Sequence, residues 1–301
     1  MTSFGDANER RRILRALIAE PEVAVLPGVF DGFSAKLVEQ YGYKAAFVTG
    51  SGVAESRFGV PDVGLVGLSE SLSGASVVAQ RTSLALIADA DTGYGSPVNV
   101  AFTIRAFEDA GLSGVLIEDQ VWPKRCGHMA GKETISLKEM AMKVRAAADA
   151  RQDSDFVILA RTDAAATEGV DAAIERASAY ADEGADLLFA DALLSIRDIE
   201  RFAAAAKAPV LVNMGFGVRS RRTTPQLSLT QLKELGVAVA IYPRMLTAAA
   251  IMGMKRALDV FEVDCRTGET SDREDLLVSF EELNELIGLG EISELEARYA
   301  V

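Results

Sequence analysis

The chain of 301 residues is poor in the side chains that most often bind transition metals or nucleic acid. It has one histidine, two cysteines and 31 basic against 44 acidic residues, which gives a formal net charge of -13. Phosphate-backbone binding needs a basic face, so nucleic acid is not an expected partner. Cys126 and Cys265 lie far apart and no secretion signal is visible, so reduced thiols are expected rather than a disulfide. One histidine also leaves too few ligands for a zinc site.

Long apolar runs are missing as well. No stretch approaches the roughly 18 consecutive apolar residues that a membrane span requires. The first twenty residues read as a polar lead into an amphipathic helix rather than as a targeting segment. We therefore expect a soluble, cytoplasmic protein with no membrane partner. Hydrophobic residues make up 49% of the chain, which is ample for a large core.

The chain does contain a regular series of short apolar runs. Continuous rather than alternating apolar runs are typical of strands covered on both faces in a parallel sheet. Helical patterns fill most of the gaps, with cap signals at Ser96-Pro97, Ser136 and Ser228. This alternation predicts a (β/α)₈ barrel; a doubly wound sheet is the alternative, although no GxGxxG motif follows the first run. The eight runs are residues 23–30, 43–50, 84–91, 114–119, 156–163, 186–192, 209–214 and 237–243.

Three stretches do not fit this alternation. Residues 51–75 and 120–135 are longer than ordinary connections between a strand and a helix, and loops of that length are often functional. Residues 271–301 predict two more helices, broken near Gly288. Because no repeat, low-complexity tract or linker is visible, we expect a single domain over residues 1–301 with 271–301 as a helical extension.

Acidic residues follow several of the apolar runs. The active site of a (β/α)₈ barrel lies at the carboxyl ends of its strands, so these side chains are expected to meet at one mouth. Crowded carboxylates repel unless a cation lies among them, and hard oxygen ligands suit Mg²⁺ or Mn²⁺. We expect Asp89, Asp91 and Glu118 to bind this metal; Asp119 and Asp163 can equally be helix caps or ion pairs. The residues that follow the runs are Asp89, Asp91, Glu118, Asp119, Arg161, Asp163, Asp191 and Asn213.

The segment EDQVWPKRCGHMAGKE, residues 118–133, begins at Glu118 and should cover the same mouth. Its cations would face a small anionic substrate. Cys126 lies next to Arg125 and near Lys124 and His128, and this electropositive setting favours the thiolate and eases proton transfer. We therefore expect Cys126 to be catalytic, and His128 either to orient it or to be structural.

Four motifs occur in an order and at separations that resemble the isocitrate lyase and phosphoenolpyruvate mutase superfamily. They are DADTGYG (89–95), IEDQ (117–120), KRCGH (124–128) and ARTDA (160–164). KRCGH is similar to the signature of the lyase branch, whereas the mutase branch lacks the cysteine, so a phosphonomutase is a remote alternative. The resemblance implies a (β/α)₈ barrel, Mg²⁺, a mobile loop that carries the cysteine, and a homotetramer in which neighbouring barrels exchange a C-terminal helix.

The resemblance also implies roles for individual residues. Lys124, Cys126 and His128 belong to the catalytic motif, and Asp62 is an acidic residue near the substrate. Metal ligation would fall to the three carboxylates named above. The substrate-contacting positions are Thr49, Gly50, Ser51, Arg161, Asp191, Asn213 and Thr224.

The implied reaction is cleavage of a carbon-carbon bond in a 2-hydroxy di- or tricarboxylate of the 2-methylisocitrate or 2,3-dimethylmalate type. The products would be pyruvate and a carboxylic acid, with Cys126 protonating the departing carbanion. An oxaloacetate hydrolase or decarboxylase is the alternative, and a non-catalytic binder of organic acids is remoter.

Three positions depart from the pattern of methylisocitrate lyases. Asp191 stands where a glutamate is usual. Phe47 stands where a tyrosine is usual, so the base that takes the hydroxyl proton is open between Asp62, Lys124 and a metal-bound hydroxide. Ala248 stands where an arginine helps to bind a third carboxylate. The three arginines of the segment 215–222 are candidates to replace that contact.

Overall fold

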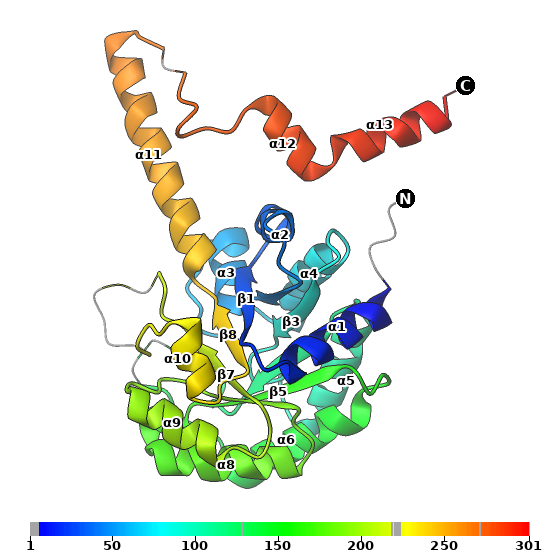
Figure 1. The fold of residues 1–301 in the computed structure, drawn as a ribbon, viewed down its shortest axis with the longest axis vertical. Helices are drawn as coiled ribbons and strands as arrows, with labels where there is room; N and C mark the ends of the chain where they lie inside the picture. Colours follow the sequence, from blue (N-terminus) through cyan, green and yellow to red (C-terminus); the bar gives the residue numbers. More distant parts are fainter. Residues whose placement is uncertain are drawn as a thin grey trace.

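The computed structural model describes residues 6–127, 129, 131–217, 219, 224–270 and 272–300. Eight parallel strands pair in chain order and close into a barrel, in which β8 returns to β1 (Figure 1). Each strand lies inside one of the eight apolar runs, so the predicted barrel is confirmed. The strands are β1 (Ala24–Val29), β2 (Ala45–Val48), β3 (Ala85–Asp89), β4 (Gly114–Glu118), β5 (Val157–Thr162), β6 (Leu187–Ala190), β7 (Val210–Asn213) and β8 (Val239–Tyr242).

Helices surround the strands, and the predicted caps begin three of them. Ser136 accepts a hydrogen bond from the backbone of Glu139 to begin α6, Ser228 forms a full capping box at α10, and Ser96 precedes Pro97 at α5. The outer helices are α2 (Gly32–Gln40), α4 (Leu68–Ala79), α5 (Pro97–Asp109), α6 (Leu137–Ala150), α7 (Ala164–Thr167), α8 (Val170–Asp182), α9 (Ile196–Ala205) and α10 (Leu229–Glu234).

Helix α1 (Ala7–Ala19) covers the amino-terminal end of the barrel. Leu14 and Ile18 are buried together with the side chains that point into the barrel. Arg11 is also buried and donates to the carbonyl oxygens of Leu112 and Glu108 at 3.2 and 2.7 Å. This end is therefore filled, and the opening lies at the carboxyl ends of the strands.

The expectation that residues 51–75 form one long loop was wrong. Helix α3 (Gly50–Val53) directly follows β2, and the π-helix η1 (Ala54–Phe58) continues it until Gly59, whose φ of +64° ends the helical path. Helix α4 then starts at Leu68. The sequence did not predict these helical turns because glycine and serine usually indicate loops. Thr49 begins the first turn by accepting a hydrogen bond from the backbone of Gly52. Residues 120–135 are irregular where described, as predicted.

A long helix leads from the barrel to the C-terminal residues. Helix α11 (Met245–Thr267) projects from the barrel, and Thr247 is its one buried residue (Figure 1). Helices α12 (Phe280–Ile287) and α13 (Leu289–Arg298) follow, separated at Gly288 as predicted, and neither has a buried residue. Within the described ranges, no helix combines the length and the apolar character that crossing a membrane requires.

Candidate active site

A small cavity of about 40 Å³ lies at the carboxyl ends of the strands. It is lined by eight of the predicted site residues. Space of this size holds few waters, so a carboxylic acid can reach the cavity only when the segment above it moves. The eight residues are Thr49, Ser51, Asp62, Asp89, Lys124, Cys126, Arg161 and Asn213.

The turn after β2 forms one wall of the cavity. Thr49 and Ser51 are buried, and their hydroxyl groups lie 3.0 Å apart. The backbone of Gly50 lies close to the Asp89 carboxylate. A Cβ atom at this position would lie 2.8 Å from Oδ2 of Asp89. A larger residue at this position would therefore push the Asp89 carboxylate away. Phe47 also lines the cavity, so the position has no hydroxyl group to act as a base.

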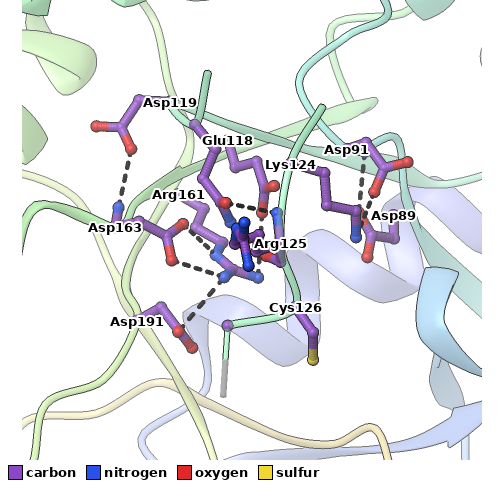
Figure 2. A network of polar contacts seen from close by, with 12 residues as sticks. Asp89, Asp91, Glu118, Asp119, Lys124, Arg125, Cys126, Arg161, Asp163 and Asp191 are labelled. Carbon is purple, nitrogen blue, oxygen red and sulfur yellow. Dashed lines mark hydrogen bonds and ion pairs between the residues drawn. The ribbon is translucent and has the colours of Figure 1, made fainter. Parts of the chain in front are cut away.

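Lys124 is buried among carboxylates on one side of the mouth (Figure 2). Its ammonium group forms ion pairs with Asp62 and, at 2.8 Å, with Asp91. Burial raises the pKa of Asp91 to about 7, and the charges of Asp89 and Asp62 add to the effect although Lys124 opposes it. Burial alone would lower the pKa of Lys124, but the surrounding carboxylates outweigh it and hold that pKa well above its usual value. Lys124 therefore keeps its proton.

Arg161 is fixed among three carboxylates on the other side of the mouth (Figure 2). It donates twice to Asp163 at 2.9 Å and lies 3.2 Å from Glu118 and 3.4 Å from Asp191. The ring of Phe189 lies 5.3 Å from the guanidinium carbon. Most donors of Arg161 are thus already bound, so its position is preorganised rather than mobile. Asp163 lies beside the site as an ion-pair partner.

Lys132 binds the C-terminal end of the loop to the barrel. Its buried ammonium group lies 2.6 Å from Asp163 and 3.0 Å from Asp191, and it donates to the backbone oxygen of Gly127 at 2.9 Å. Gly127 itself is packed tightly, because a Cβ atom on it would lie 2.3 Å from Oδ2 of Asp191. Lys124 and Lys132 thus bind the segment that carries Cys126 to the barrel from both ends.

Cys126 is buried in this segment and faces the cavity. Its backbone nitrogen donates to the backbone oxygen of Asp62 at 3.0 Å. Nη2 of Arg244 lies 3.8 Å from the cysteine sulfur, and Glu55 binds the same guanidinium. Cys126 and Cys265 form no disulfide with each other.

Asp119 lies behind the mouth rather than in it. It is fully buried and accepts hydrogen bonds from Thr162 at 2.7 Å, from Tyr180 at 2.8 Å and from the backbone of Asp163 at 2.8 Å. Arg176 adds an ion pair at 3.3 Å. These contacts tie β4, β5 and α8 together, and Asp119 is not among the residues that line the cavity.

The cavity lining leaves out five of the predicted site residues that the structure describes, namely Gly50, Asp91, Glu118, Asp191 and Thr224. Asp191 is buried behind Gly127 and Arg161, and Thr224 is buried. His128 lies outside the described residues. So do Arg221 and Arg222, and the exposed Arg219 does not line the cavity. Nothing in the described structure therefore gives the segment 215–222 a substrate contact.

The carboxylates fit a hard divalent cation by their chemistry. Oε1 of Glu118 and Oδ1 of Asn213 are buried and have no hydrogen-bond partner within the described residues. Burial raises the pKa of Glu118 well above its usual value, although Arg161 opposes it, so the site is short of positive charge. Among the described residues, no three acidic, cysteine or histidine groups are arranged as a ready coordination shell. Lys124 supplies the positive charge beside Asp91 in this closed arrangement.

Arg244, Glu55 and Lys132 were missed by the sequence analysis. Arg244 could have been found, because it follows the apolar run of β8 just as the acidic residues follow the runs of β3 and β4. Lys132 and Glu55 carry no comparable signal, since their partners lie far away in the sequence.

The chain is similar to one protein family and to two named lyases. The family described as phosphoenolpyruvate phosphomutase matches residues 14–261. The chain is 39% identical to 2,3-dimethylmalate lyase of Eubacterium barkeri, over 95% of this chain and 97% of that protein. It is 44% identical to probable 2-methylisocitrate lyase 2 of Corynebacterium glutamicum, over 83% of this chain and 80% of that protein.

Two solved structures are similar over nearly the whole chain. Oxaloacetate acetylhydrolase in complex with 3,3-difluorooxalacetate has a TM-score of 0.88 at 32% identity, covering 97% of this chain and 98% of that one. Phosphonopyruvate hydrolase in complex with oxalate and Mg²⁺ has a TM-score of 0.84 at 29% identity, covering 97% and 99%.

The contacts of Lys132 predict that it keeps the loop closed. Replacing it by methionine removes the charge but keeps the length of the side chain. Hydrogen bonds to charged groups contribute about 1.5–3 kcal/mol, so amide hydrogen exchange in residues 121–127 should accelerate by about tenfold or more. Arg125→Met is the matched control, since the Arg125 side chain is exposed. Equal exchange in the Lys132→Met and wild-type proteins would show that Lys132 does not hold the loop.

Proposed function

Because the chain belongs to the isocitrate lyase and phosphoenolpyruvate mutase superfamily, we propose that it is a Mg²⁺-dependent carbon-carbon lyase. It cleaves a 2-hydroxy carboxylate of the 2,3-dimethylmalate or 2-methylisocitrate type to pyruvate and a carboxylic acid. The observation that carries the proposal is Cys126, the thiol of the lyase-branch motif, in one cavity with Asp89, Lys124 and Arg161. The relatives named as lyases support the same reaction class.

The metal would be held by Asp89 and Glu118, the last residues of β3 and β4, and by Asp91, two residues beyond β3. When bound, Mg²⁺ supplies the charge that polarises the oxygen of the 2-hydroxy acid and offsets the buried carboxylates. Support comes from the unpartnered oxygen of Glu118 and from the Mg²⁺ complex of phosphonopyruvate hydrolase.

Arg161 would bind the carboxylate at the 2-hydroxy end, with the turn of Thr49, Gly50 and Ser51 opposite it. Its fixed position favours one orientation of the substrate, because little side-chain freedom is left to lose on binding. Asn213, whose Oδ1 is buried in the cavity wall without a described partner, would contact the substrate there as well.

Bond cleavage requires a base for the hydroxyl proton and an acid for the departing carbon. Lys124 is a poor base because it holds its proton, so Asp62, which faces the same cavity, is the better one. As the hydroxyl proton leaves, the carbon-carbon bond breaks and its electron pair remains on the departing acid. Cys126 then gives its proton to that carbanion, and Lys124 offsets the developing negative charge.

A homotetramer that exchanges its C-terminal helices would explain residues 245–301. Helices α11 to α13 expose large apolar side chains such as Leu258 and Phe261, which are 64% and 65% exposed. An apolar groove of about 590 Å³ runs beside α11, and Phe33, Leu37, Ile251 and Met254 are among its lining residues. We propose that α12 and α13 of a neighbouring copy cover this groove, with residues 271–301 as the exchanged extension.

Oxaloacetate hydrolysis is the second candidate, because a solved oxaloacetate acetylhydrolase is among the similar structures. The two reactions differ in their products. A lyase yields pyruvate and a saturated acid, whereas hydrolysis of oxaloacetate yields oxalate and acetate.

The first test is product identification with the Mg²⁺ form. We expect pyruvate from 2,3-dimethylmalate or 2-methylisocitrate, and a loss of about 10²-fold in rate or more in Cys126→Ser, as for removal of a general acid. The matched control is Cys265→Ser, which changes the exposed second cysteine and should keep the wild-type rate. If the protein forms oxalate and acetate from oxaloacetate and cleaves neither hydroxy acid, it is a hydrolase rather than a lyase.

The second test is the pH dependence of Mg²⁺ binding, measured by isothermal titration calorimetry in buffers of different ionisation enthalpy. Burial raises the pKa of Asp91 to about 7, so this carboxyl is mostly protonated below that pH and must release the proton to bind a metal. Affinity should therefore rise about tenfold between about pH 6 and about pH 8, with proton release. Asp171→Asn, an exposed carboxylate, should leave this dependence intact. If Mg²⁺ binds without proton release at every pH tested, Asp91 is not a metal ligand.

The third test is the mass in solution by analytical ultracentrifugation. The wild-type protein should sediment as four chains of 32.1 kDa each. Phe261→Ser should shift the population to smaller species by removing exposed apolar area, whereas the neighbouring Glu262→Gln should not. A wild-type mass of one chain would contradict the exchange of helices.

A further inference from the structure

Arg244 and Glu55 form a pair beside Cys126 that the proposed mechanism does not use. Arg244 lies directly after β8 and precedes α11, whereas Glu55 belongs to η1. The guanidinium binds the carboxylate with both terminal nitrogens, Nη1 to Oε2 at 3.1 Å and Nη2 to Oε1 at 2.6 Å. Nη2 also lies 3.8 Å from the sulfur of Cys126.

The geometry lets one guanidinium serve both partners. Arginine has five N–H donors in a rigid plane, and the carboxylate of Glu55 uses one on each terminal nitrogen. A second N–H on Nη2 therefore remains for the sulfur. Because two bonds to Glu55 fix the plane of the group, the direction of that donor is set by Glu55.

We propose that Arg244, held by Glu55, is a positioning residue for Cys126 that stabilises the thiolate left after the thiol has given up its proton. In that step the S–H bond breaks, its electron pair stays on sulfur, and a C–H bond forms on the departing acid. The identity of the proton acceptor rests on the proposed function, whereas the pairing of Arg244 with Cys126 does not.

The charge of Arg244 is maintained in its partly buried position. Burial alone would lower the pKa of Arg244, but the hydrogen bonds that it donates to Glu55 and the charge of Cys126 outweigh burial and raise that pKa. A positive group within about 4–6 Å of an acid lowers the pKa of that acid by roughly one to three. A guanidinium at this distance therefore makes the thiol a better proton donor near neutral pH.

Other charged groups around Cys126 are bound elsewhere. Lys124 is paired with Asp62 and Asp91, and Arg161 with three carboxylates. Asp89 faces the same cavity with negative charge, which would disfavour the thiolate. Arg125 and His128 are close in sequence, and His128 lies outside the described residues.

The test measures the thiolate of Cys126 directly. In a Cys265→Ser background Cys126 is the one remaining cysteine of the chain, so the ultraviolet absorbance of thiolate reports its titration. We expect Arg244→Gln to raise the midpoint by about one pH unit or more, and Arg244→Lys to raise it less. Glu55→Gln should also raise it, since the guanidinium loses its orientation. The matched control is Arg57→Gln, an exposed arginine of η1, which should not move the midpoint.

Histidine titration is removed by repeating the series in a His128→Asn background, because His128 is the only histidine. In the product assay Arg244→Gln should lower kcat by about tenfold and keep KM within about twofold, since the loss falls on the proton transfer.

An unchanged thiolate midpoint in Arg244→Gln overturns the proposal. If that variant does not fold, unchanged midpoints in both Arg244→Lys and Glu55→Gln overturn it equally. A shifted midpoint in a protein that cleaves none of the tested acids supports the pairing and rejects the proposed function.

Discussion

Negative charge buried at the carboxyl ends of the strands is the constraint on which the rest of the site depends. Asp91, Glu118, Asp163 and Asp191 are removed from water there, and a buried carboxylate is costly unless a cation or several hydrogen bonds compensate it. Arg161 supplies one such charge from β5. The remaining compensation comes from Lys124 and Lys132, both in the segment that covers the mouth.

The same ion pairs therefore hold the loop over the mouth and neutralise the mouth. Cys126 lies between the two lysines in the sequence, and both ammonium groups are paired with carboxylates. Figure 2 shows Lys124 and Cys126 on this segment beside the carboxylates. The same closure leaves a cavity of about 40 Å³, from which most water is excluded. A carbanion formed there would meet one proton donor rather than bulk solvent. In our account this is why Cys126, the proton donor, lies on a loop, whereas Arg161 and the carboxylates lie at the ends of strands.

The barrel and much of the mouth could be predicted from the sequence because both follow from local patterns. Eight apolar runs gave eight strands, and Asp89 and Glu118 are the last residues of β3 and β4. The contacts of Lys132 and the pair of Arg244 with Glu55 could not be predicted, because each joins residues far apart in the chain. Asp119 had the same sequence signal as Glu118, and the contacts that distinguish it come from Thr162, Tyr180 and Arg176, which the sequence does not place beside it. The helices after residue 50 were not predicted, because their glycines and serines usually indicate loops.

Anomalous scattering from a crystal of the protein with Mn²⁺ and oxalate tests the central claim most directly, since Mn²⁺ favours the same oxygen ligands as Mg²⁺. The account predicts an ion bound by carboxylates from Asp89, Asp91 and Glu118, with oxalate near Arg161 and the Cys126 segment closed above it. An ion bound away from these carboxylates, or an empty mouth in the presence of both ligands, would contradict it.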